Sequence, residues 1–345
     1  MVISGVSSII MVHVAERVHP FLARAVTPTV VVDVLRSPLF RSVAWRSPTL
    51  FSHHPLMGGG IMRNVLTLGV LVLFSLVVAC SKQPETPPVG IIGALPQEVE
   101  AVKTLIKTPT EEKVHGKIVT RGTIHGTSVV LVESGMGKVN AAATTQMLVT
   151  KYGAKEIVFS GVAGGVNPQS EVGDVIIAEQ VAQHDYGIVT PAGKKSWRPG
   201  TLTFDAVPLS ALWYSLSGSG LFQRLRQVAT NVDLGVVPAG LREGNEKPSI
   251  RFGTVVTGDE FIASEEKRKW LETTFGADAT EMEGGAFAQV CESNHVDCVI
   301  IRTVSDLANE SSHVDFPKFA TYAAQNSAAM ISALFQAPSE TKNRP

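Results

Sequence analysis

The chain has 345 residues, of which 44% are hydrophobic, and a formal net charge of −1 at pH 7. This length fits one large domain or two small ones, and the near-neutral balance gives no electrostatic reason to expect nucleic acid as a partner. The three cysteines, Cys80, Cys291 and Cys298, have no spacing typical of a metal site or a disulfide framework, so we expect no bound metal. Cys291 and Cys298 lie in apolar segments, which is typical of buried thiols.

The N-terminal part differs in composition from the rest of the chain. No lysine precedes Lys82, and residues 1–60 hold five arginines but only two acidic residues. These residues show no sustained helical or alternating period. We therefore predict that residues 1–61 are not part of the mature protein and that translation starts at Met62. A transit-type leader, which is Arg-rich and acid-poor, is the alternative.

Residues 62–80 have the pattern of an export signal. An apolar run of about fifteen residues precedes Cys80, which is short for a membrane-spanning helix of about twenty residues. The segment VVAC that ends at Cys80 resembles a bacterial lipoprotein cleavage box, in which the cysteine becomes the lipidated N-terminus. The Pro-rich residues 81–88 are then a tether. We expect a protein of the bacterial cell envelope on the periplasmic side, held at the membrane by its lipid anchor only. An uncleaved anchor is the alternative, and the protein is cytoplasmic if the signal is not used.

Periodic patterns predict a folded domain over residues 89–337, followed by a tail over 338–345. Short apolar runs predict strands at 89–93, 118–122, 128–132, 156–160, 174–178, 252–256 and 299–304. Helices are predicted from Pro96, over 138–152, from the N-cap Ser264 to Trp270, over 286–291 and along the segment from Phe316 to Leu334. Strands that alternate with helices indicate an α/β fold with a mostly parallel or mixed sheet. Residues 187–249 are less regular, and we interpret them as a long insertion or lid.

Charged residues at three strand ends are candidates for chemistry, because α/β folds place their sites at the carboxyl ends of strands. Glu98 follows the first strand, the segment Glu281-Met282-Glu283 precedes a helix, and the segment 302–306 ends an otherwise apolar strand. Each has a structural alternative. Glu98 can be a first-turn carboxylate that favours the helix dipole, and a buried Arg and Asp within 302–306 can be a structural ion pair.

Together, several segments resemble one family. GIIGALPQEVE, ESGMGKVNAA, FSGVAGGV, VTGDEFI, EMEGGAFAQVC and IRTVSDLA occur in the order found in methylthioadenosine/S-adenosylhomocysteine nucleosidases, which belong to the wider nucleoside phosphorylase superfamily. The resemblance covers residues 89–336. It implies a three-layer α/β/α sandwich around a mixed, mostly parallel and partly barrel-like sheet, assembled as a homodimer.

The resemblance also implies a role for each matched residue. Glu98 orients and activates the attacking water, Arg302 helps to hold that water, and Asp306, steadied by Ser305, delivers a proton to adenine N7. The implied substrate-binding residues are Met282 and Glu283 on the ribose, Glu281 as a supporting acid, Phe261 and Ile262 in the base pocket, and Met136 and Phe316 as apolar walls near the 5′-substituent.

Two departures from the family pattern concern the water and the 5′-group. Val162 stands where several family members have a serine near the water. The segment between Asp185 and Thr257, which shapes the 5′-group pocket and part of the dimer contact in the family, is longer than usual. The identity of the 5′-substituent is therefore open.

The implied reaction is hydrolysis of the N-ribosidic bond of 5′-substituted adenine nucleosides, of the methylthioadenosine, S-adenosylhomocysteine or 5′-deoxyadenosine type, to adenine and the free sugar. Such a bond breaks through an oxocarbenium-like state, the leaving adenine needs a proton, and the water needs a base. Two carboxyl groups suit these tasks, so no cofactor is required. A phosphorylase is the nearest alternative, but residues 93–99 and 128–139 contain no arginine for phosphate. A futalosine-type hydrolase and a non-catalytic nucleoside-binding surface lipoprotein are the others.

Overall fold

The computed structural model describes residues 86–201, 207–238, 242 and 247–336. The predictions for residues 1–61, for the signal at 62–80 with its lipidation site Cys80, and for the tail at 338–345 lie outside this part of the chain. None of the helices in the described ranges is long and apolar enough to span a membrane.

A ten-stranded mixed sheet forms the centre of the fold, in the order β11-β10-β6-β12-β5-β1-β4-β3-β2, with β9 paired to β6. The strands are β1 (Val89–Gly93), β2 (Lys107–Val114), β3 (Lys117–Ile124), β4 (Thr127–Glu133), β5 (Glu156–Gly165), β6 (Val175–Gln183), β9 (Tyr214–Ser215), β10 (Ile250–Thr257), β11 (Ala279–Glu281) and β12 (Asp297–Asp306). Strand β11 pairs with both β10 and β5, so β11, β10, β6, β12 and β5 close on themselves as a small barrel.

Parallel pairing dominates the central strands. Strand β1 is parallel to β4 and β5, β12 is parallel to β5, and β10 is parallel to β6 and β11. The antiparallel pairs are the barrel contacts β12–β6 and β11–β5 and the outer strands β2, β3 and β9. The carboxyl ends of β1, β5 and β12 therefore share one edge, where a site is expected, and β11 joins β5 at this end through Gly164 and Gly165.

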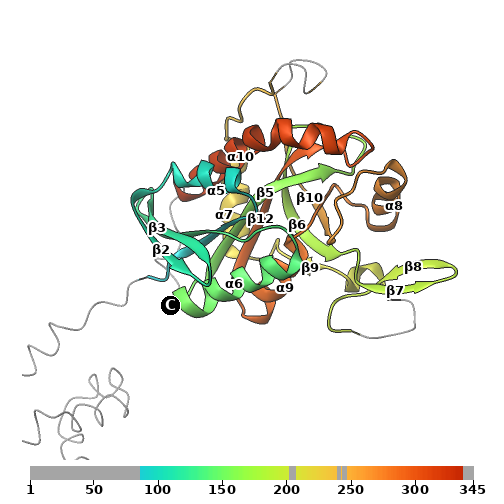
Figure 1. The fold of residues 1–345 in the computed structure, drawn as a ribbon, viewed down its shortest axis with the longest axis horizontal. Helices are drawn as coiled ribbons and strands as arrows, with labels where there is room; N and C mark the ends of the chain where they lie inside the picture. Colours follow the sequence, from blue (N-terminus) through green and yellow to red (C-terminus); the bar gives the residue numbers. More distant parts are fainter. Residues whose placement is uncertain (1–85, 202–206, 239–241, 243–246, 337–345) are drawn as a thin grey trace, which may run out of the picture. The chain divides into compact units, whose positions relative to one another are not determined.

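Helices cover both faces of the sheet, as Figure 1 shows. On one face α5 (Pro96–Lys103), α7 (Gly220–Ala229) and α10 (Ser312–Gln336) share a core with β1 and β12. On the other face α6 (Lys138–Tyr152) and α9 (Gly284–Ser293) enclose a core in which Phe159 and Phe287 meet edge to face at 5.3 Å. A separate cluster of apolar residues joins α8 (Glu265–Phe275) to β10. The predicted α/β/α sandwich around a mixed sheet is confirmed.

Most local predictions are confirmed, and several strands are longer than predicted. Helix α6 has the predicted bounds, α5 begins with Pro96, and the Ser264 hydroxyl caps α8 by accepting the Lys267 N–H at 3.3 Å. Strands β5, β6 and β12 extend past the predicted ends to Gly165, Gln183 and Asp306. Helix α7 and the strands β2 and β11 were not predicted.

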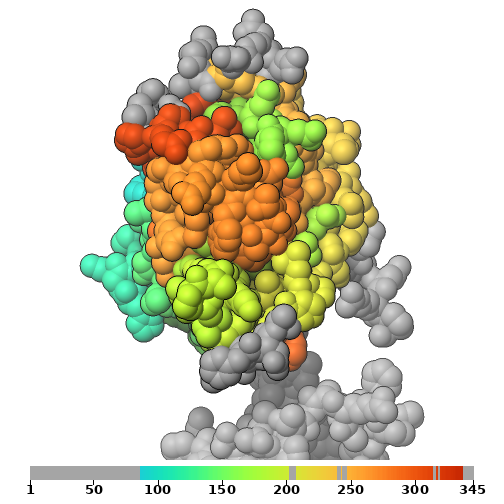
Figure 2. All heavy atoms as spheres, turned by 90° about the vertical axis from the view of Figure 1, so that its right-hand side faces the viewer, coloured from blue at the N-terminus to red at the C-terminus, as the bar shows by residue number. Residues whose placement is uncertain are grey.

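The segment 187–249, interpreted from the sequence as a long insertion or lid, contains regular elements. A two-stranded hairpin, β7 (Gly187–Thr190) and β8 (Gly193–Ser196), stands apart from the main sheet. It lies on the same face of the molecule as α8 (Figure 2). Helix α7, by contrast, buries Leu221, Phe222 and Leu225 in the core beside α10. That part of the segment is therefore structural.

Candidate active site

A cavity lies where the carboxyl ends of β1, β5, β11 and β12 converge, and all the residues selected from the sequence line it. These residues are Glu98, Met136, Val162, Phe261, Ile262, Glu281, Met282, Glu283, Arg302, Ser305, Asp306 and Phe316. A second set, not assigned to the site from the sequence, also lines it: Ala94, Leu95, Gly161, Ala163, Gly164, Glu260 and Thr280. Most of these are small residues that contribute backbone, and their one signal in the sequence is the glycine cluster at Gly164-Gly165, which fits either backbone close to a ligand or a tight turn. The structure brings the predicted residues together, and the roles assigned to them stay predictions.

Glu98 is the third residue of α5, and its carboxylate is buried under the start of that helix. Its Oε2 accepts the N–H groups of Ala94 at 2.6 Å and Leu95 at 3.0 Å, and its Oε1 accepts the Val162 N–H at 3.2 Å. Burial raises the pKa of Glu98 to about 6, although Arg302 and the three N–H groups oppose the shift. A carboxylate with this pKa is ionised at neutral pH and is a stronger base than an exposed one.

Val162 contacts Glu98 through its backbone. Its side chain has no hydroxyl, and its N–H donates to Glu98 Oε1 at 3.2 Å. This N–H is available because β5 continues through Val162 along the cavity wall. The departure from the family pattern therefore leaves the Glu98 carboxylate with a donor on this side.

Arg302 and Glu281 form an ion pair with both side chains 1% exposed. The Glu281 Oε2 accepts from Arg302 Nη2 at 2.6 Å and from Nε at 3.2 Å, while the guanidinium lies 4.7 Å from the centroid of the Phe159 ring. The structural alternative considered for segment 302–306, an ion pair within that segment, is thus not the arrangement of Arg302. Its partner comes from β11, whose carboxylate neutralises a charge that is costly to bury alone.

Glu283 lies between this ion pair and the turn before α6. Its Oε1 accepts the Gly137 N–H at 2.8 Å, and its Oε2 lies 3.8 Å from Arg302 Nη2. Burial and the neighbouring charge of Glu281 raise the pKa of Glu283 to about 7, against the opposing effect of Arg302. A carboxylate held in this way can accept hydrogen bonds from sugar hydroxyls.

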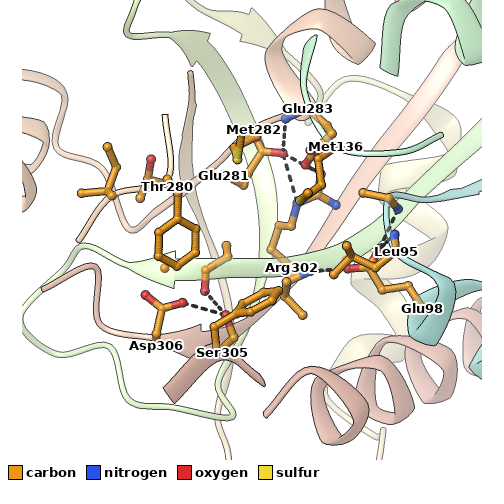
Figure 3. A pocket seen from close by; sticks show the side chains of 18 of the residues that line it. Leu95, Glu98, Met136, Thr280, Glu281, Met282, Glu283, Arg302, Ser305 and Asp306 are labelled. Atoms are coloured by element: carbon orange, nitrogen blue, oxygen red, sulfur yellow. Dashed lines mark hydrogen bonds and ion pairs between the residues drawn. The ribbon is translucent and has the colours of Figure 1, made fainter. Parts of the chain in front are cut away.

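Asp306 lies at the other end of the cavity from Glu98, as Figure 3 shows, with Arg302 between them. The Ser305 hydroxyl donates to Asp306 Oδ2 at 2.9 Å, and the Ala308 N–H donates to Oδ1 at 3.0 Å. These donors fix the orientation of a carboxyl group that is only 3% exposed. The two acids can therefore act on different parts of one bound molecule.

The mouth of the cavity is apolar. The rings of Phe261 and Phe316 meet edge to face at 5.9 Å, and Ile262 is buried beside them. Met136 and Phe261 are 58% and 49% exposed, so the rim is open on this side. Such walls suit a flat aromatic ring and an apolar substituent.

The cavity is rich in carboxyl groups and poor in cations. Among the described residues that line it, Arg302 is the only cation, and it is already paired. The carboxyl groups are those of Glu98, Glu260, Glu281, Glu283 and Asp306. This lining favours a neutral ligand on which positive charge develops, and it disfavours an anion.

Comparisons with known proteins show the family to which the chain belongs. Residues 88–336 match the family model of the phosphorylase superfamily. The 5′-methylthioadenosine/S-adenosylhomocysteine nucleosidase of Mycobacterium tuberculosis is 35% identical over 243 residues, which are 70% of this chain and 94% of the relative. The aminodeoxyfutalosine nucleosidase of Campylobacter jejuni is 31% identical, over 70% of this chain and 96% of the relative.

Solved structures show the same likeness. The futalosine hydrolase of Helicobacter pylori superposes with a TM-score of 0.62 at 26% identity, covering 72% of this chain and 97% of that one. The methylthioadenosine/S-adenosylhomocysteine nucleosidase of Streptococcus pneumoniae, solved with 8-aminoadenine, has a TM-score of 0.60 at 28% identity, covering 73% and 100%. The chain therefore belongs to the phosphorylase superfamily and, within it, to the family of the methylthioadenosine/S-adenosylhomocysteine nucleosidases.

Proposed function

We propose that the protein hydrolyses the N-ribosidic bond of 5′-substituted adenine nucleosides, of the methylthioadenosine, S-adenosylhomocysteine or 5′-deoxyadenosine type. It is an N-glycosyl hydrolase, and its products are adenine and the free sugar. The observation that carries the proposal is the placement of two buried carboxyl groups, Glu98 and Asp306, at opposite ends of one cavity whose mouth is apolar.

The geometry suggests a division of tasks. Asp306, oriented by Ser305, delivers a proton to N7 of the leaving adenine, while Glu98 takes a proton from the attacking water. Glu283 binds the ribose hydroxyls, and the surrounding carboxylates favour the positive charge that develops on the sugar. Arg302 helps to hold the water beside Glu98. The positive charge of Arg302 also lowers the pKa of Glu98 and so favours the ionised base. The base packs against Phe261 and Ile262, and the 5′-group lies toward Met136 and Phe316.

We favour water over phosphate as the nucleophile that attacks the sugar. Among the described residues that line the cavity, the one cation is Arg302, which is already paired with Glu281 and so is not available to bind phosphate. The test is adenine release from methylthioadenosine with and without phosphate, together with analysis of the sugar. We expect equal rates and free 5-methylthioribose. Phosphate-dependent turnover that yields a ribose 1-phosphate would overturn the assignment.

A second substrate, aminodeoxyfutalosine, is supported by the relative from Campylobacter jejuni. Comparison of kcat/KM for aminodeoxyfutalosine and methylthioadenosine decides between them. A ratio far below one would assign the protein to the methylthioadenosine type alone.

We also propose a homodimer formed through the apolar surface near the cavity mouth. Its residues are Met136, Val139, Tyr186, Val189 and Phe261, all large, apolar and exposed. The segments that carry them meet at Lys138, Asp185 and Asp259, which hydrogen-bond to one another. Such a patch is typical of an interface. Light scattering of the wild type and of Val189→Asp tests it, since the variant should be monomeric.

The N-terminal proposal is that Met62 is the start of translation and that Cys80 carries a lipid in the cell envelope. The export-type apolar run before Cys80 supports it. Sequencing the N-terminus of the unprocessed Cys80→Ala variant in the native host tests the start, because cleavage before Cys80 removes this information from the wild type. Cys80→Ala should abolish processing and membrane fractionation, and unchanged behaviour of this variant would contradict the anchor.

A further inference from the structure

We propose that Lys138, Asp185 and Asp259 form an ionic strut that couples the sugar-binding carboxylate of Glu283 to the segment that holds the base. The inference rests on the proposed function for the identity of those two subsites. None of the three strut residues lines the cavity, so they are positioning residues and not catalytic ones.

The strut joins three segments that are far apart in the sequence. Lys138 begins α6, Asp185 follows β6, and Asp259 follows β10. Lys138 Nζ lies 2.6 Å and 2.7 Å from the two Asp185 carboxylate oxygens, and its backbone N–H donates to Asp259 Oδ1 at 2.8 Å. The Asp259 N–H donates to Asp185 Oδ2 at 2.9 Å, which closes the network.

The central ion pair is partly shielded from water. The Lys138 and Asp185 side chains are 18% and 13% exposed. Although burial acts to raise the pKa of Asp185, the Lys138 ammonium and the Asp259 N–H hold it below its usual value. Asp185 is therefore ionised at neutral pH, and loss of the Lys138 ammonium leaves this partly buried carboxylate without its partner.

One end of the strut reaches the sugar subsite through Gly137. The Gly137 N–H, directly before Lys138, donates to Glu283 Oε1 at 2.8 Å. Gly137 has a φ of +94°, and a Cβ there would lie 3.1 Å from Asp259 Oδ1. The turn at Gly137 therefore packs closely on the Asp259 carboxylate. The position of the Gly137 N–H depends on the position of Lys138, the next residue in the chain.

The other end reaches the base subsite through Asp259. The residues that follow it, Glu260, Phe261 and Ile262, line the cavity, and the Gly258 N–H before it donates to the Glu281 carbonyl at 3.1 Å. A shift of Asp259 therefore moves the base wall and the turn at Gly137 together. Recognition of the sugar hydroxyls and of the base should be coupled energetically.

A substrate cycle separates this role from general stabilisation. We compare Lys138→Met with the wild type on methylthioadenosine and on its 3′-deoxy analogue, which lacks a hydroxyl for Glu283. A lost or misaligned charge-assisted hydrogen bond costs about 10- to 100-fold. We expect kcat/KM to fall by about that factor on the ribosyl substrate, and by much less on the 3′-deoxy analogue. Lys138→Arg should recover part of the loss.

Arg224→Met is the matched control. Its ion pair with Glu156 has a similar length, 2.7 Å, and similar exposure, 15% and 24%, but Glu156 begins β5 at the opposite end of the strand from the cavity. Arg224→Met should leave unchanged the ratio of kcat/KM on methylthioadenosine to kcat/KM on the 3′-deoxy analogue. Equal losses on both substrates for Lys138→Met, or no loss on either, would overturn the strut.

Hydrogen exchange on the substrate-free protein gives a readout that does not depend on activity. In Lys138→Met we expect faster exchange at residues 135–140 and 258–262 together, with residues 224–229 unchanged. Uniform loss of protection, or loss at one segment alone, contradicts the coupling. If the wild type fails to release adenine while both segments respond together, the proposed function fails and the strut stands.

Discussion

Glu281 and Arg302 are paired at 2.6 Å between Oε2 and Nη2 in the interior of the barrel, and the same carboxylate organises the segment that follows it. Its Oε2 also accepts the N–H groups of Glu283 at 3.1 Å and Gly284 at 2.7 Å, and its Oε1 accepts from the Thr257 hydroxyl. Glu281 thereby positions both the guanidinium of Arg302 and the backbone of Glu283, the proposed sugar-binding residue.

Glu281→Gln should destabilise the fold strongly. The change keeps the shape of the side chain but leaves Arg302 with Glu283 at 3.8 Å as its remaining carboxylate partner in this cluster. Removal of one member of a buried pair costs about 3–5 kcal/mol of unfolding free energy, which urea denaturation measures. The control is Glu179→Gln, whose ion pair with Arg226 at 3.4 Å is exposed and should matter by less than about 1 kcal/mol. Equal stability of the two variants would contradict the prediction.

Gly161→Ala should impair turnover with little effect on folding. A Cβ at Gly161 would lie 3.0 Å from Glu98 Oε1 and 3.1 Å from Arg302 Nη1, so it would push the proposed base from its position. A small misplacement of reacting groups can cost about 10²-fold in rate. Gly218→Ala is the control, because no atom lies within 4 Å of the place that its new methyl group would take. Steady-state kinetics of the two variants, at matched thermal stability, test the claim. Normal kcat in Gly161→Ala would rule out this placement of the base.

The sequence was sufficient to predict the elements whose patterns are local. Helix α6 and strand β1 have their predicted bounds, because each has an uninterrupted pattern that ends at or beside a glycine. The charged residues at strand ends were also found, because a charge in an apolar strand is visible in the sequence. Glu98 and the end of β12 converge on one cavity because β1 and β12 both run parallel to β5.

What could not be predicted depends on contacts between distant segments. Strand β11 has only three residues and gains its identity by pairing with β10 and with Gly164 and Gly165 of β5. The partner of Arg302 could not be predicted either, since Glu281 reaches it across the barrel that β11 closes. Helix α7 was predictable but was missed: Leu221, Phe222, Leu225 and Ala229 recur at helical spacing after the N-cap Ser219, within a segment that its Gly and Pro residues made look irregular.

Glu98 should make stability and activity respond to pH in opposite directions. The unfolded carboxyl group loses its proton near pH 4.5, whereas the buried one holds it until about 6. Between these values the unfolded state binds fewer protons, so this group's contribution to stability is lost as pH rises, by about 2 kcal/mol in total. Catalysis needs the ionised base, so kcat/KM should fall below about pH 6.

Glu98→Gln isolates the contribution to stability, because it cannot titrate and the other groups are common to both proteins. The unfolding free energy of the variant minus that of the wild type should increase by about 2 kcal/mol between pH 4 and pH 7, because only the wild type loses stability over this range. Urea denaturation of both proteins at the two pH values measures this difference. A difference that does not change with pH would show that the Glu98 pKa is not raised.

Asp306→Asn and Glu98→Gln should both cripple turnover of methylthioadenosine, for different reasons. The amide in Asp306→Asn keeps the shape of the side chain but cannot deliver an acidic proton, so kcat should fall by about 10² or more while adenine nucleosides still bind. The amide in Glu98→Gln cannot take a proton from water. A p-nitrophenyl riboside separates the two variants, because its leaving group departs without protonation. On that substrate Asp306→Asn should recover much of its lost rate, and Glu98→Gln should not.

The two carboxyl groups lie at opposite ends of the cavity, so neither is expected to take over the task of the other. Ser305→Ala supplies an intermediate case, because it removes the hydroxyl that donates to Asp306 Oδ2 at 2.9 Å but leaves the acid in place. Ser305→Ala should lower the rate on methylthioadenosine by a smaller factor than Asp306→Asn does. Its rate on the p-nitrophenyl riboside should equal that of the wild type. Equal impairment of the Asp306 and Glu98 variants on both substrates would mean that the tasks are not divided in this way. Near-normal methylthioadenosine turnover by Asp306→Asn would remove the proton donor from the mechanism altogether.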